Sequence, residues 1–259
     1  MPYQLAVFDW AGTVIDYGSF APMGVFVETF RQFDVSVSVA QARVPMGMPK
    51  RDHIAAMLED PDIAAQWRAS RGSAPDDDAI DALYAVFVPA NEVVAAQYAT
   101  LVPGVTDMLA DLTQRGIRVA STTGYTRSIM AKVIPVAAAQ GFSPEVVVCS
   151  DDLIAGRPGP HGVYQCMIST GVVKVTDVIK VDDTAPGIGE GVSAGCLTVG
   201  VAMSGNSVGL TPEAVAALSP TDYARARNRA AAELFEAGAD HVIDTVADLP
   251  ALLDQLEAG

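Results

Sequence analysis

Basic residues are scarce in this sequence. Lys and Arg together number 16 against 31 Asp and Glu residues, so the formal net charge at pH 7 is −15. Nucleic acid and anionic membrane surfaces repel a chain this acidic, which argues against both as general partners. A small anionic substrate is compatible with the composition, provided that a metal ion or a local cluster of cations receives it.

Cysteines and long apolar runs are also scarce. The three cysteines, Cys149, Cys166 and Cys196, are widely spaced and form no metal-ligand or disulfide pattern, so we expect buried thiols. The first residues show no basic segment followed by a long apolar stretch, and no run approaches the roughly eighteen apolar residues of a membrane span. We therefore expect a soluble, cytoplasmic protein.

A short apolar run, Leu5–Phe8, precedes Asp9 and a turn that contains Gly12. A run of this length is typical of a strand buried on both faces in a parallel sheet. Asp9 would then lie at the carboxyl end of the strand, where ligands bind in open α/β sheets. An aspartate that merely caps the turn is the common alternative.

Residues 20–98 are expected to be almost entirely helical. Phe26 and Phe30, and further along Ile54 and Leu58, recur at helical spacing and predict core positions. The acidic residues 76–78 favour the start of a further helix, which Pro89 should kink or end. Half of the chain is apolar, which is ample for one large domain or two smaller ones.

From about residue 103 the predicted elements alternate. Helices are expected at 105–112, 128–139, 160–170 and 186–194, and strands at 117–122, 146–148, 177–182 and 197–201. This order predicts an α/β fold, a doubly wound parallel sheet with a helical domain inserted after its first strand. We expect a core domain of residues 1–18 and 99–259 and a helical cap of residues 19–98. The Ala-rich residues 220–237 should form a solvated helix without a chemical role.

Polar residues follow several of these strands. Residues 121–126, STTGYT, form a hydroxyl-rich turn ahead of a helix, which is suited to a phosphate although such residues are also ordinary helix caps. Arg157 lies in a later loop, where it could hold a phosphate or be a solvated surface residue. Asp182 and Asp183 end another strand, and adjacent carboxylates near Asp9 favour a magnesium ion between them.

Taken in order, Asp9, Thr123, Arg157 and the pair Asp182 and Asp183 resemble the four motifs of the haloacid dehalogenase (HAD) superfamily. The resemblance spans the whole chain and implies a HAD-like, Rossmann-like core with a mobile cap. It implies that the first aspartate is a nucleophile that accepts a phosphoryl group. The hydroxyl and the basic residue would hold that group, and the last carboxylate would help to bind magnesium.

Two positions depart from the superfamily pattern. Phosphatases of this kind generally carry a second aspartate two residues after the nucleophile, where this chain has Ala11. An ester hydrolase would lose proton transfer to the leaving alkoxide, a factor of roughly 10² to 10⁴. Many members also place an aspartate where this chain has Gly187, and Asp182 could replace it, either directly or through a metal-bound water.

Lys50 is one of only four lysines and the only one in the predicted cap. Pro49 is suited to the first helical position, which would place Lys50 near the positive end of a helix dipole and favour its neutral amine. A helix end contributes only about 0.3 to 1 kcal/mol, so burial and either Arg51 or a second cation must supply most of the shift. A solvated lysine at the start of a surface helix is the alternative.

The stretch around Lys50, with DWAGT at 9–13, STTGYT at 121–126 and residues 16–22, 180–183 and 190–191, resembles phosphonoacetaldehyde hydrolases, or phosphonatases. The resemblance implies that Lys50 forms an imine with the substrate aldehyde, and that relatives form homodimers. A carbon–phosphorus bond leaves a carbanion, which a protonated imine can accept as an enamine, so that no acid is needed at Ala11.

The resemblance and the positions of neighbouring residues give candidate roles to several residues. Catalytic roles fall to Asp9, Lys50, His53 and Tyr125. His53, three residues after Lys50, is a candidate proton relay or, alternatively, a capping or core histidine, and Tyr125 could hydrogen bond within the closed site or be a tyrosine packed at the turn. Contacts to substrate fall to Trp10, Met46, Thr123, Gly124 and Arg157. A magnesium ion would be bound by Asp9, the carbonyl of Ala11, Asp182 and Asp183.

Three other functions are compatible with parts of the pattern. A phosphate ester hydrolase of the same superfamily would turn over common phosphate esters, although Ala11 argues against it. A dehalogenase would need neither magnesium nor the phosphate-binding turn. A noncatalytic phosphonate-binding protein would bind without releasing phosphate.

Overall fold

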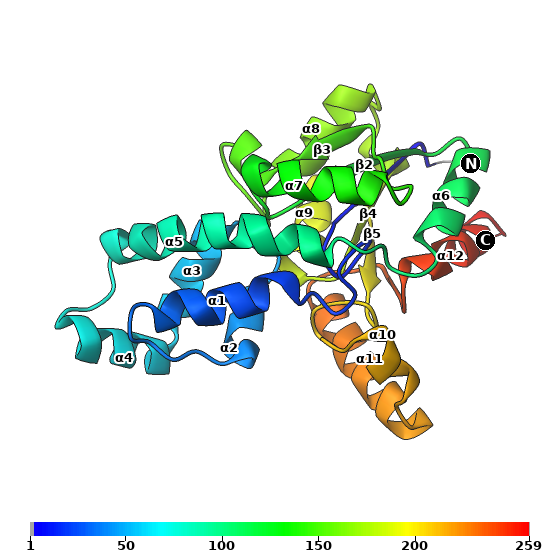
Figure 1. Cartoon of the computed structure of the whole chain (residues 1–259). Helices are drawn as coiled ribbons and strands as arrows, with labels where there is room; N and C mark the ends of the chain where they lie inside the picture. The colour runs from blue at the N-terminus through cyan, green and yellow to red at the C-terminus, as the bar shows by residue number, and fades with distance from the viewer. Residues whose placement is uncertain (1–2, 259) are drawn as a thin grey trace.

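A parallel sheet forms the centre of the molecule, as the computed structural model shows for residues 3–258 (Figure 1). Its strand order is β3-β2-β1-β4-β5-β6, and every pairing is parallel. Residues 1, 2 and 259 of the predicted core range lie outside the described residues. The strands are β1 (Leu5–Phe8), β2 (Arg118–Thr122), β3 (Val146–Val148), β4 (Val178–Asp182), β5 (Leu197–Val201) and β6 (His241–Ile243).

The first strand is buried on both faces, as its apolar run predicts. Phe8 belongs to a hydrophobic cluster on one face, whereas Leu5 and Val7 belong to a cluster on the other. In register, Phe8 lies between Ser121 of β2 and Val181 of β4. The residues that follow these three strands therefore meet at one edge of the sheet.

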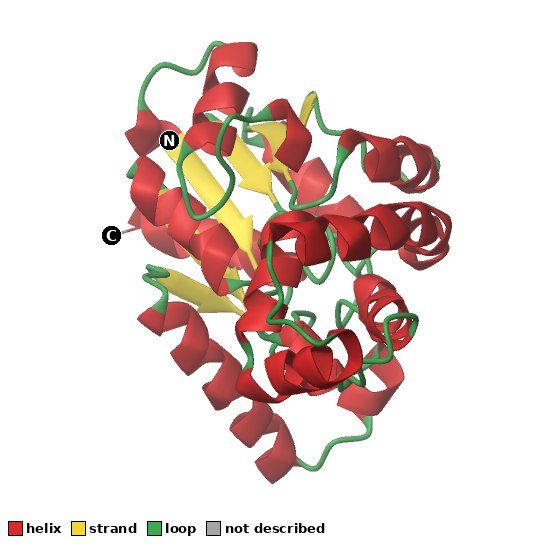
Figure 2. Cartoon of the chain, turned by 90° about the vertical axis from the view of Figure 1, so that its left-hand side faces the viewer, coloured by secondary structure: helices red, strands yellow, loops and turns green. Residues whose placement is uncertain are grey.

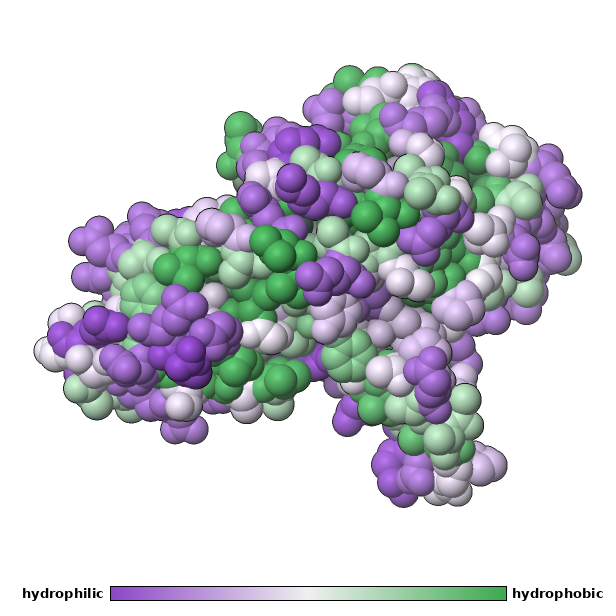
Figure 3. All heavy atoms as spheres, in the orientation of Figure 1, coloured by the Kyte–Doolittle hydropathy of each residue, from purple (hydrophilic) through white to green (hydrophobic). Residues whose placement is uncertain are grey.

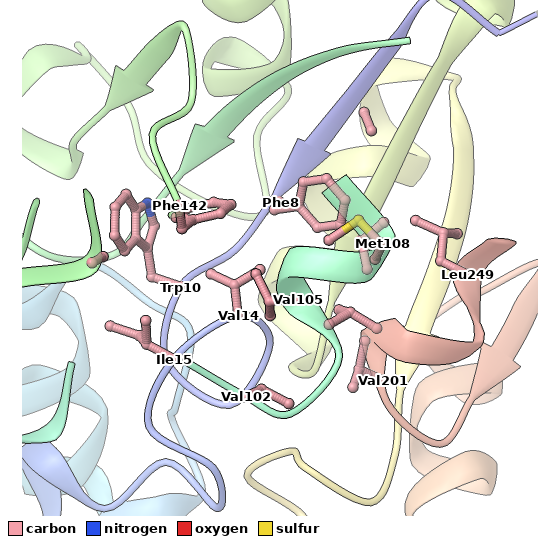
Figure 4. Close-up of a cluster of buried hydrophobic side chains, with 14 of the residues drawn as sticks. Phe8, Trp10, Val14, Ile15, Val102, Val105, Met108, Phe142, Val201 and Leu249 are labelled. Atoms are coloured by element: carbon pink, nitrogen blue, oxygen red, sulfur yellow. The ribbon is translucent and has the colours of Figure 1, made fainter. Parts of the chain in front are cut away.

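Helices cover both faces of the sheet, which confirms the doubly wound α/β fold. Figure 4 shows part of the cluster around Phe8, to which α6, α7 and α12 contribute. The helices are α6 (Val105–Gln114), α7 (Arg127–Ala138), α8 (His161–Thr170), α9 (Ala185–Ala194), α10 (Pro212–Ala216), α11 (Pro220–Glu236) and α12 (Leu249–Ala258). Short 3₁₀ turns are η1 (Ala96–Tyr98), η2 (Ser150–Asp152), η3 (Val175–Asp177) and η4 (Val246–Asp248).

Helices between β1 and β2 form a second group beyond one end of the sheet (Figures 1 and 2). They are α1 (Ala21–Arg31), α2 (Val39–Arg43), α3 (Lys50–Glu59), α4 (Pro61–Arg71) and α5 (Asp77–Ala95). Their buried apolar side chains form a cluster that draws only on residues 23–94. These inserted helices thus have a hydrophobic core of their own.

The structure corrects the expectation at Pro89 that the helix could end there. Helix α5 continues through Pro89 to Ala95, because Phe87, Asn91 and Ala95 lie on a buried face that packs against α1, α3 and α7. Proline removes one backbone hydrogen bond, and this packing outweighs that loss. The segment Asp77–Tyr98 is long and apolar enough to cross a membrane by length and composition, although it contains no unbroken apolar run of that length.

Candidate active site

A small cavity lies at the sheet edge where β1, β2 and β4 end. Its volume is about 20 Å³, room for roughly one water molecule. It is lined by Asp9, Ala11, Met46, Gly47, Lys50, Thr123, Gly124, Tyr125, Arg157 and Thr184. The structure thus brings together most of the predicted site residues, including Lys50 from the inserted helices and Asp9 from the sheet.

Three carboxylates beside this cavity could hold a metal ion. One oxygen each from Asp9, Asp182 and Asp183 lies within 4.8 Å of the others, and all three residues are buried. Asp183 accepts hydrogen bonds from Thr13 Oγ1 at 2.9 Å and from the Asn206 backbone N–H at 2.8 Å. Burial, then the charge of Asp182, raises the pKa of Asp9 to about 6. The pKa of Asp183 is raised well above its usual range by burial and by Asp9.

Asp182 occupies the space that a side chain at position 187 would need. Its Oδ1 accepts hydrogen bonds from the Thr184 backbone N–H at 3.0 Å and from Thr184 Oγ1 at 2.7 Å. A Cβ atom placed on Gly187 would overlap the Asp182 carboxylate. The glycine that departs from the superfamily pattern therefore makes room for the extra aspartate five residues earlier.

Arg157 is buried, so the alternative of a solvated surface arginine is wrong. Its Nη1 lies 2.8 Å from Asp9 Oδ1 and 3.3 Å from Asp182 Oδ2, and its Nε donates to Glu190 Oε2 at 3.0 Å. Burial opposes its charge, but these carboxylates raise its pKa above the usual range. Arg157 is therefore a fixed cation beside Asp9.

A second cation, Lys180, lies behind Arg157. Its Nζ is 3.0 Å from Asp182 Oδ2 and 3.1 Å from Glu190 Oε2, and it donates to Thr122 Oγ1 at 2.7 Å. Thr122 also accepts from Arg157 Nη2 at 2.8 Å and donates to Glu190 at 2.8 Å. We call Thr122, Lys180 and Glu190 the rear cluster, because it holds Arg157 from the side away from the cavity.

In this region four buried carboxylates face two buried cations of the core, and Lys50 of the inserted helices adds a third cation only while its amine is protonated. The carboxylates are Asp9, Asp182, Asp183 and Glu190, and the cations that pair with them are Arg157 and Lys180. Buried charges are stable only when they are paired. A divalent cation among Asp9, Asp182 and Asp183 would restore the balance.

Lys50 is the first residue of α3, and Pro49 is its N-cap, one position earlier than predicted. Its Nζ lies 4.0 Å from Met46 Sδ and 5.1 Å from the ring centre of Tyr125. Burial lowers the pKa of Lys50 to about 8; Asp9 opposes this shift and Arg157 adds to it. The Lys50 amine is therefore buried against apolar and aromatic groups, and the alternative of a solvated lysine is wrong.

The second cation near Lys50 is Arg157 and not Arg51. The guanidinium of Arg51 points away from the cavity and pairs with the exposed Asp81 at 2.7 Å and Asp77 at 3.2 Å, both on α5. Because α3 turns by about 100° per residue, neighbouring side chains leave the helix in different directions. Of the two expected sources of the pKa shift at Lys50 besides burial, the second cation is therefore right and Arg51 is wrong.

His53 and Trp10 do not line the cavity. The ring of His53 stacks on Phe26 at 4.0 Å, and its Nε2 lies 2.8 Å from the Ala42 carbonyl oxygen. Burial and the charge of Lys50 hold its pKa well below the usual value. Trp10 lies in the core of the sheet domain, edge-on to Phe142 with ring centres 5.0 Å apart (Figure 4). Both rings are placed by packing.

Comparisons with known proteins agree with this geometry. A family model described as haloacid dehalogenase-like hydrolase matches residues 3–195. The chain is 52% identical to the phosphonoacetaldehyde hydrolase of Paraburkholderia xenovorans, over 98% of this chain and 96% of that protein. It is 45% identical to that of Klebsiella pneumoniae, over 97% and 94% respectively. The chain belongs to the phosphonoacetaldehyde hydrolase family. This family lies within the haloacid dehalogenase-like hydrolases.

Solved structures show the same relation. A phosphonoacetaldehyde hydrolase-like protein from Oleispira antarctica superposes with a TM-score of 0.97 at 41% identity, covering 100% of this chain and 94% of that one. A hydrolase from Pseudomonas syringae superposes with a TM-score of 0.70 at 16% identity, over 98% of this chain and 99% of that one, which shows a shared fold alone.

Sequence reasoning missed the rear cluster, although Lys180 and Glu190 belong to the stretches that resemble phosphonoacetaldehyde hydrolases. A signal for it was present in glycines on two helices that cover the sheet. A Cβ on Gly162 would overlap Glu190, and one on Gly191 would press on Lys180. Glycine inside a helix weakens it by about 1 kcal/mol, so its repeated use there indicates close approach of another group. The three cysteines are free and buried, as expected.

Proposed function

We propose that this protein hydrolyses the carbon–phosphorus bond of phosphonoacetaldehyde to acetaldehyde and phosphate. One observation carries the proposal: Lys50, a buried amine with a lowered pKa, and the carboxylate Asp9 face the same small cavity, with Ala11 in place of an acid. The names of the curated relatives support the same reaction.

The neutral Lys50 amine attacks the aldehyde carbon, and uptake of one proton with loss of water gives a protonated imine; the same proton is released when the amine is regenerated. Asp9 then attacks phosphorus, and the electrons of the carbon–phosphorus bond move into the imine to give an enamine. Water hydrolyses the aspartyl phosphate to phosphate. The enamine takes up a proton, and water releases acetaldehyde and regenerates the Lys50 amine.

The remaining side chains hold the reactants. Arg157, Thr123 and Gly124 position the phosphoryl group through the guanidinium and the turn after β2. Met46 and Tyr125 lie against Lys50 and shield its amine from water. His53 does not line the cavity, so as our candidate proton relay it would act through Lys50, three residues earlier on α3, with Nδ1, which has no hydrogen-bond partner among the residues that the structure describes. Trp10 has no contact with the cavity, so we assign it support of the Asp9 strand.

The metal that fits this site best is magnesium. Its donors would be Asp9, Asp182, Asp183 and the backbone carbonyl of Ala11, all of them oxygen atoms, which Mg²⁺ prefers. When bound, Mg²⁺ offsets negative charge on the phosphoryl oxygens. The four buried carboxylates, set against the two buried core cations Arg157 and Lys180, support a divalent ion.

Borohydride reduction in the presence of phosphonoacetaldehyde tests the proposed reaction. We expect covalent capture of a two-carbon fragment at Lys50, located by peptide mass spectrometry, and no capture in Lys50→Arg. Turnover without capture, or retained activity in Lys50→Arg, would exclude the imine route. Common phosphate esters serve as the comparison, because their hydrolysis by both proteins would instead indicate an ester hydrolase.

We further propose that residues 19–98 act as a cap that moves on a core of residues 1–18 and 99–259. We also propose that the protein works in the cytoplasm and that it forms a homodimer. An apolar groove of about 210 Å³ between α1 and α5 supports the dimer, and hydrophobic residues gather over these helices in Figure 3. Light scattering of the purified protein at micromolar concentration measures the mass, and a monomer there contradicts the dimer.

A further inference from the structure

The cavity between Lys50 and Asp9 is too small for the proposed substrate. Its volume of about 20 Å³ holds roughly one water molecule, whereas phosphonoacetaldehyde carries a phosphonate group and two carbon atoms. The cap must therefore move away to admit the substrate and return to bring Lys50 to it. How closely it returns depends on the surface where cap and core touch.

That surface includes two core glycines opposite one segment of the cap, residues 46–49, and a third glycine within the segment itself. A Cβ on Gly124 would lie 2.7 Å from the Met48 carbonyl oxygen, and a Cβ on Gly156 would overlap Pro49 Cγ. On the cap side, a Cβ on Gly47 would overlap Thr184 Oγ1. Core loops after β2, β3 and β4 therefore touch this segment at points where one of the two residues in contact is a glycine.

The contact between Gly156 and Pro49 adjoins two residues of the site. Lys50 follows Pro49 and begins α3, and Arg157 follows Gly156. A displacement at this contact moves the Lys50 helix relative to Arg157 and Asp9. By contrast, the carboxylates and the rear cluster belong to the core and do not depend on where the cap sits.

We propose that Gly156 is a positioning residue whose lack of a side chain lets Pro49 seat and so sets the distance between Lys50 and the phosphoryl site. The inference rests on the proposed function, because it concerns capture of the aldehyde by Lys50. The φ of Gly156 lies outside the left-handed region that disfavours alanine, so we expect a substitution to act mainly through the added Cβ.

Gly156→Ala tests the contact, and Pro49→Ala supplies its rescue. The Gly156→Ala variant should hold the cap away and slow borohydride trapping at Lys50 at least tenfold, since a misplacement of about 1 Å can cost 10²-fold. In the double variant the clashing Cγ is gone and the remaining Cβ of residue 49 is 3.6 Å away, which is ordinary contact. Trapping should therefore return to within threefold of the Pro49→Ala rate.

Ile154→Ala is the matched control, because Ile154 lies in the same loop and is 96% exposed. It should trap at the wild-type rate. If Gly156→Ala also traps at that rate, or if Pro49→Ala fails to rescue it, the inference is wrong. Failure of the wild-type protein to trap at all would instead count against the proposed function.

A distance measurement tests the inference without any reaction. Spin labels on Ala69→Cys in α4 and Ser169→Cys in α8 report the cap-to-core distance, because both sites are exposed and the native cysteines are buried. We expect pulsed electron paramagnetic resonance to show a shift to longer distances in Gly156→Ala and recovery in the double variant. Identical distance distributions in all variants would overturn the proposal.

Discussion

The state of the Lys50 amine is set mainly by burial. A pKa of about 8 in place of 10.5 corresponds to roughly 3 kcal/mol of destabilised charge, whereas the end of a helix supplies about 0.3 to 1 kcal/mol. The Met46 thioether and the Tyr125 ring surround the amine and offer it weak interactions in place of water. Asp9 pulls the pKa back upward, so the carboxylate limits how far the shift goes.

The pH dependence of imine formation should report this shift. Only the neutral amine attacks an aldehyde, so in metal-free protein the rate of cyanoborohydride trapping at Lys50 should rise about tenfold per pH unit and level off near pH 8. Trapping rates measured from pH 6 to 10 give the midpoint. A free lysine derivative under the same conditions should still be rising at pH 10, and a midpoint above 10 for Lys50 would contradict the burial argument.

Glu190 should matter although it does not reach the cavity. Glu190→Gln keeps the shape of the side chain but leaves Arg157 and Lys180 with one carboxylate fewer, and breaking such buried pairing costs about 3–5 kcal/mol. We expect a lower Tm, a kcat/KM reduced roughly 10- to 100-fold and weaker inhibition by inorganic phosphate, because Arg157 loses its orientation.

The inhibition constant for phosphate separates positioning from general loss of stability. The exposed Glu213→Gln is the control and should leave both Tm and phosphate inhibition unchanged. If Glu190→Gln lowers Tm while the phosphate constant stays at its wild-type value, the rear cluster is structural only.

At the scale of elements, strong local patterns predicted most strands of the sheet. Long-range contacts determine strand β6 and the continuation of α5 past Pro89, which local patterns did not predict. The apolar run before Asp9 and the alternation after residue 103 predicted β1 to β5 to within about a residue, since both signals are local. The short β6 has only half-buried His241 and Val242 before buried Ile243, and no range was predicted for it. The prediction that the helix could end at Pro89 failed because the helix is held by packing against α1, α3 and α7, and local sequence does not report such long-range contacts.

The site was predictable where the order of several motifs resembled a known family. Asp9, Lys50 and Arg157 lie at strand ends, in loops and at helix starts where ligands bind, but their residue types alone left a turn cap, a solvated lysine and a surface arginine open. Trp10 and His53 were assigned to the site by their nearness in sequence to Asp9 and Lys50, yet their rings turn into two different hydrophobic clusters. Side-chain direction depends on packing, which sequence spacing alone does not fix.

The site has a carboxylate at position 182 on strand β4 and a glycine at position 187 on helix α9, and this arrangement gives a prediction at the scale of elements. Gly187→Ala would push its Cβ into the Asp182 carboxylate, so we expect Mg²⁺ affinity to fall at least tenfold in isothermal titration calorimetry. Moving the carboxylate, by Asp182→Gly together with Gly187→Asp, should recover part of that affinity because the helix then supplies the oxygen atoms from the same space.

Ser193→Ala on the exposed side of α9 is the control and should bind Mg²⁺ like the wild type. Unchanged Mg²⁺ affinity in Gly187→Ala would show that the Asp182 carboxylate has no part in the metal site. A double variant that binds Mg²⁺ no better than Gly187→Ala would show that a carboxylate at position 187 cannot replace the one at position 182.

At the scale of the whole molecule, metal binding should stabilise the fold. Asp9, Asp182 and Asp183 bring three buried carboxylates together, and the pKa values of Asp9 and Asp183 are raised because these carboxylates are buried and repel each other. A divalent ion relieves that repulsion only in the folded state. At a concentration of 100 times Kd it should add about 2.7 kcal/mol to the free energy of unfolding.

For a chain of this size that gain corresponds to a rise in Tm of roughly 5–10 °C, measurable by calorimetry with Mg²⁺ against EDTA. Sodium chloride at equal ionic strength controls for screening of the net charge of −15. Asp183→Asn removes one metal ligand and one of the repelling charges. Without metal, the loss of that charge should not lower the Tm of this variant below that of the wild type. With Mg²⁺, the rise in its Tm should largely disappear. An equal rise in both proteins would mean that Mg²⁺ stabilises the acidic surface and not this site.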